Sequence, residues 1–176
     1  MTSPANSPPP KFELVPASRA HEPILANLLQ LYAHDFSEFH DIEINGDGRF
    51  TYNQLPLYFT EPNSHPFLIA IDDKPAGFVF VKKGSELTGN QHAWDMAEFF
   101  ILRAHRRRGL GTRIASQIFS RFPGPWEVRV MHSNSSAKQF WASAIENFTG
   151  MLSHPITIEK ESEPWNLFTF DSKPTP

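Results

Sequence analysis

The segment EFFILRAHRRRGLGT, residues 98–112, decides the fold. Its first part is apolar and strand-like, and its second part is a turn rich in arginine and glycine that opens a helix. Glycine lets the backbone approach an anion closely, the first N–H groups of a helix have no partner within it, and arginine adds positive charge. The segment therefore predicts a phosphate-binding turn at residues 106–112, and the anion that we expect there is the pyrophosphate of a coenzyme.

Length and composition favour one globular domain, because 176 residues with 40% hydrophobic content can bury a full core. We expect residues 1–10, rich in serine and proline, to be a disordered tail, residues 11–171 to form the domain, and residues 172–176 to be a second tail. The formal charge of −3 argues against a surface built for nucleic acid or for an anionic membrane. The chain has no cysteine, which excludes disulfides and thiolate sites.

The sequence shows neither a membrane span nor a signal peptide. No apolar run is long enough to cross a bilayer, and residues 1–10 are polar where a signal peptide needs an apolar stretch. We therefore expect a cytoplasmic protein.

Hydrophobic spacing predicts the element order β-α-(α)-β-β-β-α-β-α-β-β, with no internal repeat. Spacings of three and four residues indicate helices, and short apolar runs between turn residues indicate strands. The expected strands are residues 11–15, 66–71, 76–81, 93–102, 126–131, 152–158 and 165–170, and the expected helices are 24–39, 110–122 and 137–148, with a short one at 55–59. The rest of segment 41–64 has no clear pattern.

In element order over residues 11–170, the chain resembles the GNAT superfamily of acyl-CoA-dependent N-acyltransferases. The superfamily signature Arg/Gln-x-x-Gly-x-Gly/Ala is met by Arg106, Gly109 and Gly111. Other phosphate motifs do not fit, because no Gly-Lys-Ser/Thr follows and Ile114 stands where a dinucleotide fingerprint has its third glycine. The resemblance implies a mixed α/β (α+β) fold, in which helices flank a mostly antiparallel central sheet with a V-shaped cleft for coenzyme A.

The resemblance also implies acetyl-CoA as the cosubstrate, with no metal. The pantetheine arm would bond the main chain of the signature strand, the pyrophosphate would lie on the phosphate-binding turn, and Asn134 would touch the coenzyme unless it only caps a helix. The implied coenzyme-binding residues are Phe99, Phe100, Ile101, Arg106, Arg107, Arg108, Gly109, Leu110, Gly111, Thr112 and Asn134. The alternative for the three arginines is a solvated basic loop or a nucleic-acid patch.

Glu98 is the candidate general base, at a position where relatives often carry a carboxylate. An alkyl ammonium with a pKa of about 10 is mostly protonated at neutral pH, so that its attack on a thioester needs a base or a water chain. Strand alternation places Glu98 on one face with Met96 and Phe100, an apolar setting that raises a carboxyl pKa. The alternatives are a structural carboxylate paired with an arginine and one turned outward by a bulge.

Trp141 departs from the family pattern, because many relatives have a tyrosine there that protonates the leaving thiolate. Indole cannot donate that proton, although a thiol of pKa about 8.5 is a tolerable leaving group without it. His132, Tyr32 and Tyr58 are the candidate substitutes.

The acceptor site has one weak signal, the negative charge concentrated in residues 34–47. This charge suits an ammonium-bearing acceptor, with Asp35 as the candidate contact, and a solvated acidic face is the alternative. His34 and Glu38 have no third ligand at a fixed spacing, so we expect no metal site.

These observations predict an EC 2.3.1-type N-acetyltransferase, which moves the acetyl group of acetyl-CoA to a primary amine of a small molecule or peptide by direct attack in a ternary complex. The expected partner is this amine, without nucleic acid or membrane, and a homodimer is compatible with the chain. The alternatives are a catalytically weak acetyl-CoA-binding regulator, suggested by the missing tyrosine, and a nucleic-acid-binding protein that uses Arg106–Arg108.

Overall fold

The computed structural model describes residues 11–172, so that the tail expected at residues 1–10 lies outside it, as do residues 173–176. The strands are β1 (Phe12–Pro16), β2 (Ser64–Ile71), β3 (Lys74–Lys83), β4 (Trp94–Ile101), β5 (Gly124–Met131), β6 (Ile156–Lys160) and β7 (Glu163–Ser172). The helices are α1 (Glu22–Phe36), α2 (Leu110–Arg121) and α3 (Ser135–Thr149), with short 3₁₀ turns η1 (Arg19–His21), η2 (Leu55–Phe59) and η3 (Arg103–His105).

All seven strands join one sheet in the order β1-β2-β3-β4-β5-β7-β6. Within the described residues every neighbouring pair is antiparallel except β4 and β5. The expected mixed, mostly antiparallel sheet with flanking helices is therefore confirmed.

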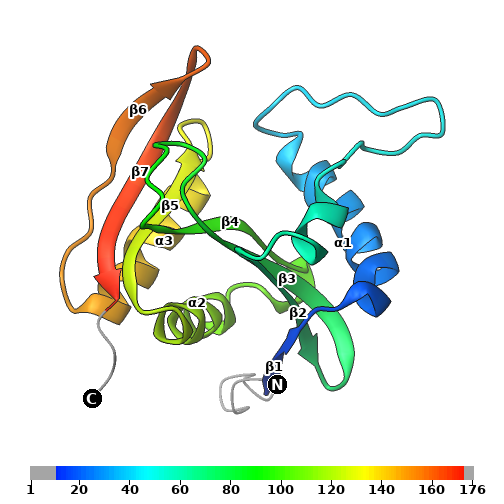
Figure 1. Ribbon diagram of the computed structural model, residues 1–176, viewed down its shortest axis with the longest axis horizontal. Coiled ribbons are helices and arrows are strands. Elements are labelled where there is room, and N and C mark those ends of the chain that lie inside the picture. Colours follow the sequence, from blue (N-terminus) through cyan, green and yellow to red (C-terminus); the bar gives the residue numbers. More distant parts are fainter. Residues whose placement is uncertain (1–10, 173–176) are drawn as a thin grey trace, which may run out of the picture.

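Helices cover both faces of the sheet (Figure 1). On one face α1 and η2 pack through Leu25, Leu28 and Tyr58 against residues of β2, β3 and β4. On the other face α2 and α3 pack together, with Ile114 and Ile145 in the larger of the two core clusters. The spacing of these apolar residues matches one buried stripe for each helix.

Several element ends differ from the expected ones. The first helix ends at Phe36 and not at Phe39, and the hydroxyl of Ser37 donates to the carbonyl of His34, an arrangement that competes with continued helix. The β2–β3 connection is a two-residue turn at Asp72 and Asp73, whose φ angles of 48° and 61° suit a tight hairpin. Ser172, expected in the C-terminal tail, is the buried last residue of β7.

A β-bulge interrupts β4. Phe80 pairs with Glu98, whereas the next residue, Val81, pairs with Met96, so that Ala97 is the extra residue. Met96 packs in the α2–α3 layer, while Ala97 and Phe100 pack in the α1 layer. The expectation that Met96 shares a face with Glu98 is therefore wrong, because a bulge shifts the alternation by one residue.

The strands β4 and β5 pair over only two positions, Trp94 with Trp126 and Asp95 with Glu127. Beyond these pairs the two strands diverge toward their carboxyl ends (Figure 1). Such a divergence in the middle of a sheet leaves main-chain groups of both strands open to a ligand.

Close contact between β3 and β4 makes Gly77 sensitive to substitution. A Cβ atom at Gly77 would lie 2.1 Å from the carbonyl oxygen of Phe100. Gly77→Ala should therefore lower the free energy of unfolding by about 1–3 kcal/mol, as overpacking does, measured by urea denaturation. Gly46→Ala is the matched control, because no atom lies within 4 Å of its added Cβ. Equal stabilities of the two variants would contradict the expectation.

Candidate functional site

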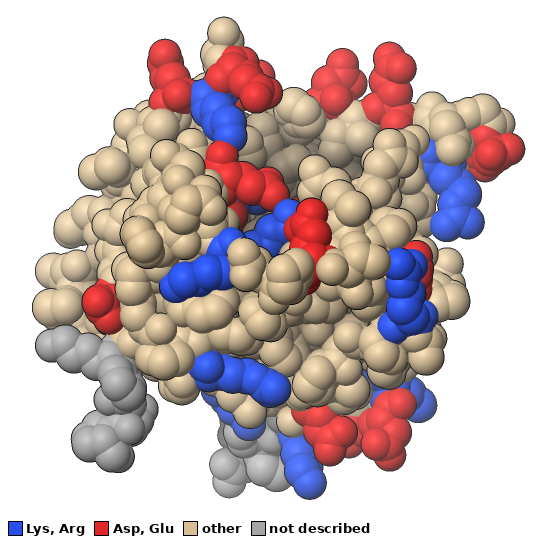
Figure 2. Space-filling model, in the orientation of Figure 1, with Lys and Arg blue, Asp and Glu red and all other residues tan. Residues whose placement is uncertain are grey.

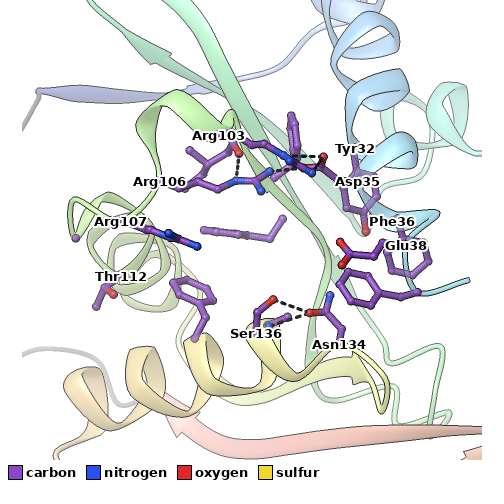
Figure 3. A pocket seen from close by; sticks show the side chains of 18 residues that line it. Tyr32, Asp35, Phe36, Glu38, Arg103, Arg106, Arg107, Thr112, Asn134 and Ser136 are labelled. Atoms are coloured by element: carbon purple, nitrogen blue, oxygen red, sulfur yellow. Dashed lines mark hydrogen bonds and ion pairs between the residues drawn. The ribbon is translucent and has the colours of Figure 1, made fainter.

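A cavity of about 520 Å³ lies at the carboxyl end of β4, between the end of α1, the phosphate-binding turn and the start of α3 (Figure 3). Its lining combines aromatic rings with a few charged and polar side chains, as small-molecule sites do. The lining residues are Tyr32, Asp35, Phe36, Glu38, Phe39, Phe99, Phe100, Ile101, Arg103, Arg106, Arg107, Gly109, Gly111, Thr112, Asn134, Ser136, Ala137 and Phe140.

The cavity brings together all the residues expected to bind the coenzyme except Arg108 and Leu110. Leu110 is only 1% exposed, because its side chain belongs to the core beneath α2. Both residues still bring a backbone N–H to the phosphate-binding turn. What the assembled residues bind stays a prediction.

The phosphate-binding turn has the backbone geometry that its glycines suggested. Gly109 caps α2 in the left-handed region, with φ at 69°, and Arg107 is also left-handed, with φ at 62°. The N–H of Arg113 donates to Gly109, so that the N–H groups before Arg113 precede the ladder of α2. The Arg107 side chain extends into the cavity (Figure 3). These features create a positively polarised rim at this end of the cavity.

Close packing of α2 and α3 shapes the cavity floor. A Cβ atom at Gly111 would lie 2.9 Å from the Phe140 ring, so that glycine permits this approach. The side chain of Asn134 accepts hydrogen bonds from the Ala137 N–H at 2.9 Å and the Ser136 hydroxyl at 3.0 Å. Asn134 is thus the N-cap of α3, and since it also lines the cavity, its coenzyme contact stays a prediction.

Two arginines clamp Asp35 at the end of α1. Arg103 and Arg106 each approach one carboxylate oxygen to 2.7 Å, and the Nε of Arg106 donates to the carbonyl of Ile101 at 2.6 Å. Burial acts to raise the pKa of Asp35, but the arginine hydrogen bonds outweigh it and hold that pKa below its usual value. Asp35 lines the cavity, as we expected of a residue that contacts the acceptor amine, but its negative charge is already paired with two arginines.

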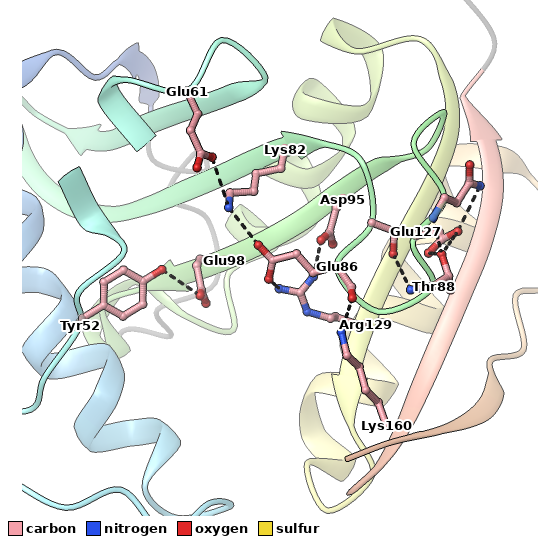
Figure 4. Close-up of polar contacts among 12 residues, drawn as sticks. Tyr52, Glu61, Lys82, Glu86, Thr88, Asp95, Glu98, Glu127, Arg129 and Lys160 are labelled. Atoms are coloured by element: carbon pink, nitrogen blue, oxygen red, sulfur yellow. Dashed lines mark hydrogen bonds and ion pairs between the residues drawn. The ribbon is translucent and has the colours of Figure 1, made fainter. Parts of the chain in front are cut away.

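Glu98 receives a hydrogen bond on each carboxylate oxygen. The Tyr32 hydroxyl donates to Oε2 at 2.6 Å. The Tyr52 hydroxyl donates to Oε1 at 3.1 Å (Figure 4). Burial raises the pKa of Glu98, and the hydrogen bond from Tyr32, the charge of Arg129 and the hydrogen bond from Tyr52 oppose this only in part. The pKa of the Glu98 carboxyl therefore lies above that of an ordinary carboxyl.

An arginine pairs with the neighbouring carboxylate Asp95, and not with Glu98. The guanidinium of Arg129 hydrogen-bonds Asp95 and lies 3.5 Å from Glu86 (Figure 4). Asp95 is 1% exposed, and its pKa is raised by burial despite Arg129. The structural, arginine-paired carboxylate considered for Glu98 is therefore found three residues earlier.

Of the candidate proton donors, only Tyr32 lines the cavity. Trp141 is 5% exposed and packs edge-on against Phe99 with ring centroids 5.0 Å apart, which makes it a core residue. Tyr58 is buried against Phe80, and His132 is exposed on the loop after β5.

Sequence reasoning missed Tyr52, the second partner of Glu98. It lies in segment 41–64, where no periodicity marks one side chain above another. The segment is held to α1 by Gln30, whose side-chain amide forms two hydrogen bonds of 2.9 Å with the main chain of Phe50. A contact set by loop closure over such a distance in sequence leaves no local pattern.

Charges of both signs are mixed on the face shown in Figure 2, where acidic and basic side chains meet at the rim of a hollow. Among residues 11–172, no group of three or more metal-ligating side chains could hold a metal ion. No helix within those residues is long and apolar enough to span a membrane.

A sequence model described as the acetyltransferase (GNAT) family matches residues 25–144. No curated protein matches the chain significantly.

Solved structures share the fold at low sequence identity. An acetyltransferase from Thermus thermophilus is 17% identical with a TM-score of 0.66, over 92% of this chain and 97% of that one. The aminoglycoside acetyltransferase AAC(6')-Ib in complex with coenzyme A and kanamycin is 12% identical with a TM-score of 0.66, over 92% and 95%. Spermidine N-acetyltransferase from Vibrio cholerae in complex with CoA and spermine is 13% identical with a TM-score of 0.59, over 92% and 95%.

The clamp on Asp35 should make stability depend on pH. A carboxylate with a lowered pKa stabilises the fold above its unfolded pKa, about 4, and this contribution is lost as the pH falls through the lower folded value. Asp35→Asn should therefore cost about 0.5–1 kcal/mol near neutral pH. Thermal unfolding from about pH 7 to pH 3 should show the difference from wild type shrink toward the acid end.

Asp41→Asn is the matched control for this series, because Asp41 is an exposed carboxylate of the same acidic segment. It should leave the unfolding temperature unchanged across the range. An Asp35→Asn effect that persists undiminished in acid would contradict the clamp as its cause.

Proposed function

The chain belongs to the GNAT acetyltransferase family, and we propose that it transfers the acetyl group of acetyl-CoA to a primary amine of a small molecule or peptide. The observation that carries this proposal is the single cavity shared by the phosphate-binding turn, the open edge of β4 and the hydroxyl that caps Glu98. The phosphate-binding turn and the hydroxyl that contacts the candidate base thus lie at two sides of one cavity. Transfer between two bound molecules needs this arrangement.

The phosphate-binding turn suits the coenzyme pyrophosphate. The end of a helix contributes about 0.3–2 kcal/mol toward a bound anion, and a charged hydrogen bond contributes about 1.5–3 kcal/mol. Arg107 is the arginine available for this bond, because Arg106 is held by Asp35 and Ile101. The structural neighbours solved with coenzyme A share this fold, which supports the same donor here.

Main-chain groups of β4 would hold the pantetheine arm beside Phe99, Phe100 and Ile101, all of which line the cavity. The thioester supplies the electrophilic carbonyl, and main-chain N–H groups near Phe100 and Ile101 would stabilise the oxyanion formed on attack. Glu98, with its raised pKa, takes up the proton of the acceptor ammonium. The amine attacks directly in the ternary complex, and no covalent enzyme intermediate is needed.

A small-molecule or peptide amine is the acceptor that we propose. The neighbours named above were solved with spermine and with kanamycin, both of which carry amino groups. Asp35 and Glu38 of the cavity wall supply negative charge on the side of α1. Because Asp35 is paired with two arginines, we expect Glu38 to attract an ammonium group more strongly than Asp35 does.

A coenzyme-binding regulator without turnover is the second candidate, and the burial of Trp141 favours it, because no proton donor replaces the family tyrosine there. Nucleic-acid binding is disfavoured, since Arg106 of the Arg106–Arg108 patch is paired with Asp35.

Thiol release from acetyl-CoA tests these alternatives, with spermine, kanamycin, n-hexylamine, lysine and a short peptide as acceptors. We expect coenzyme A to raise the melting temperature and at least one amine to drive thiol release. Stabilisation without release from any amine would support the regulator. Absence of coenzyme binding, with steeply salt-dependent binding of an oligonucleotide, would support the nucleic-acid alternative.

Arg107→Ala should weaken coenzyme A binding about tenfold, which is the loss of one charged hydrogen bond at its lower bound. Isothermal calorimetry measures the dissociation constant. Arg108→Ala is the matched control, because its side chain does not line the cavity and its backbone N–H is retained. An equal loss of affinity in the two variants would mean that only the overall positive charge of the turn attracts the coenzyme. No loss of affinity in either variant would rule out this turn as the pyrophosphate site.

Glu98→Gln should lower kcat by about 10²–10⁴-fold while leaving coenzyme A affinity near that of wild type. The wild-type rate should rise with pH through a pKa above that of an ordinary carboxyl, because only ionised Glu98 accepts a proton. The variant should lack this limb of the pH–rate profile. A wild-type profile in Glu98→Gln would rule out Glu98 as the base.

A further inference from the structure

We propose that the Tyr32 hydroxyl is the proton relay of this site: it carries protons between the bound acceptor and Glu98, and returns one to the leaving thiolate. This inference deepens the acetyltransferase proposed above and rests on it. It assigns to a residue of α1 the role that a tyrosine at position 141 would otherwise have.

The proposed relay rests on the position of Tyr32 between the cavity and Glu98. Tyr32 lines the cavity, whereas Glu98 does not. Oε2 of Glu98 accepts a hydrogen bond from the Tyr32 hydroxyl at 2.6 Å, and Oε1 accepts one from the Tyr52 hydroxyl at 3.1 Å. Tyr32 thus lines the cavity and also contacts Glu98, which gives a proton a route from the cavity to Glu98 through the Tyr32 oxygen.

Aromatic contacts hold Tyr32 in this position. Its ring lies 5.6 Å from that of Phe78 and 5.9 Å from that of Phe100, both edge-on, and 5.8 Å from that of Phe36. A ring fixed on three sides keeps its hydroxyl aimed at Glu98 without further ordering when substrates bind.

The hydroxyl stays protonated while it works. Burial, followed by the charge of Glu98, raises the pKa of Tyr32 well above its usual value. Tyr32 is therefore no independent base: its O–H donates to Glu98, while its oxygen lone pair can accept a proton from the cavity.

Protons balance through one cycle. As the ammonium N–H bond breaks, its proton goes to the Tyr32 oxygen and the original Tyr32 proton goes to Glu98, leaving a free amine, a neutral tyrosine and a protonated Glu98. The amine then forms the C–N bond, and the C–S bond of the tetrahedral intermediate breaks. The thiolate takes a proton from Tyr32, which is replenished from Glu98, and the second nitrogen proton leaves to solvent.

The groups that face Glu98 set its part in this cycle. Tyr32 from α1 and Tyr52 from segment 41–64 donate hydrogen bonds to it. Arg129 on β5 favours its charged form, and Asp95 on β4 disfavours it. The cationic and anionic neighbours thus oppose one another, which suits a carboxyl that must both take and return a proton.

Tyr32→Phe and Tyr52→Phe are the matched variants, because each removes one hydroxyl from the same carboxylate and keeps its ring. The acceptor is whichever of spermine, kanamycin or n-hexylamine wild type turns over fastest. We expect Tyr32→Phe to lower kcat about 100-fold or more, and Tyr52→Phe only a few-fold, with coenzyme A affinity unchanged in both. The deficit of Tyr32→Phe should shrink as the pH approaches the pKa of the acceptor, where free amine no longer needs the relay.

Three outcomes would overturn the relay. Near wild-type turnover in Tyr32→Phe would do so while the acetyltransferase stands. Equal deficits in both variants that do not change with pH would indicate a structural role. Absence of thiol release from wild type with every amine would overturn the proposed function and the relay together.

A less invasive substitution covers the case in which Tyr32→Phe loses coenzyme binding. Difluorotyrosine incorporated at position 32 keeps the ring and hydroxyl but makes the hydroxyl more acidic. It should shift the pH–rate profile, and the same replacement at position 52 should not. An unshifted profile would overturn the relay.

Discussion

The site depends on the brief parallel pairing of β4 with β5. Two residue pairs join the strands, and beyond Asp95 and Glu127 they separate. The pairing ends beside an aromatic cluster, in which the Trp94 ring lies 4.8 Å from that of Phe122 and 6.4 Å from that of Trp126. This packing holds together the two antiparallel parts of the sheet at the point where the hydrogen bonds between β4 and β5 stop.

Two carboxylates of β4 have different hydrogen-bond partners. Asp95 lies in the core beside Arg129 and holds β4 to β5 through that pair, while Glu98, past the bulge, accepts hydrogen bonds from two tyrosine hydroxyls. Burial raises the pKa of both carboxyls, but Arg129 hydrogen-bonds Asp95 directly, whereas it acts on Glu98 only through its charge. The extra residue Ala97 makes this division possible, because it turns Glu98 toward α1.

The sequence allowed prediction of the elements and of the phosphate-binding turn, because both depend on local signals. Leu110, Ile114 and Ile118 repeat at helical spacing, and Gly109 stands where a left-handed cap begins α2. The bulge at Ala97 left no such signal, since an alanine in a strand reads as an ordinary position. The Asp35 clamp and the Tyr52 contact also went unpredicted, because they join residues 68, 71 and 46 positions apart and depend on tertiary packing alone.

The ion pair between Asp35 and Arg106 connects the last turn of α1 to the phosphate-binding turn. Asp35 follows Tyr32 by one turn of α1, so that both side chains lie on the same side of that helix. Arg106 ties this side to the phosphate-binding turn. The last turn of α1 therefore touches both ends of the cavity: Asp35 binds an arginine of the phosphate-binding turn and Tyr32 binds the carboxylate of β4, so that a single helical turn sets the spacing between the two ends.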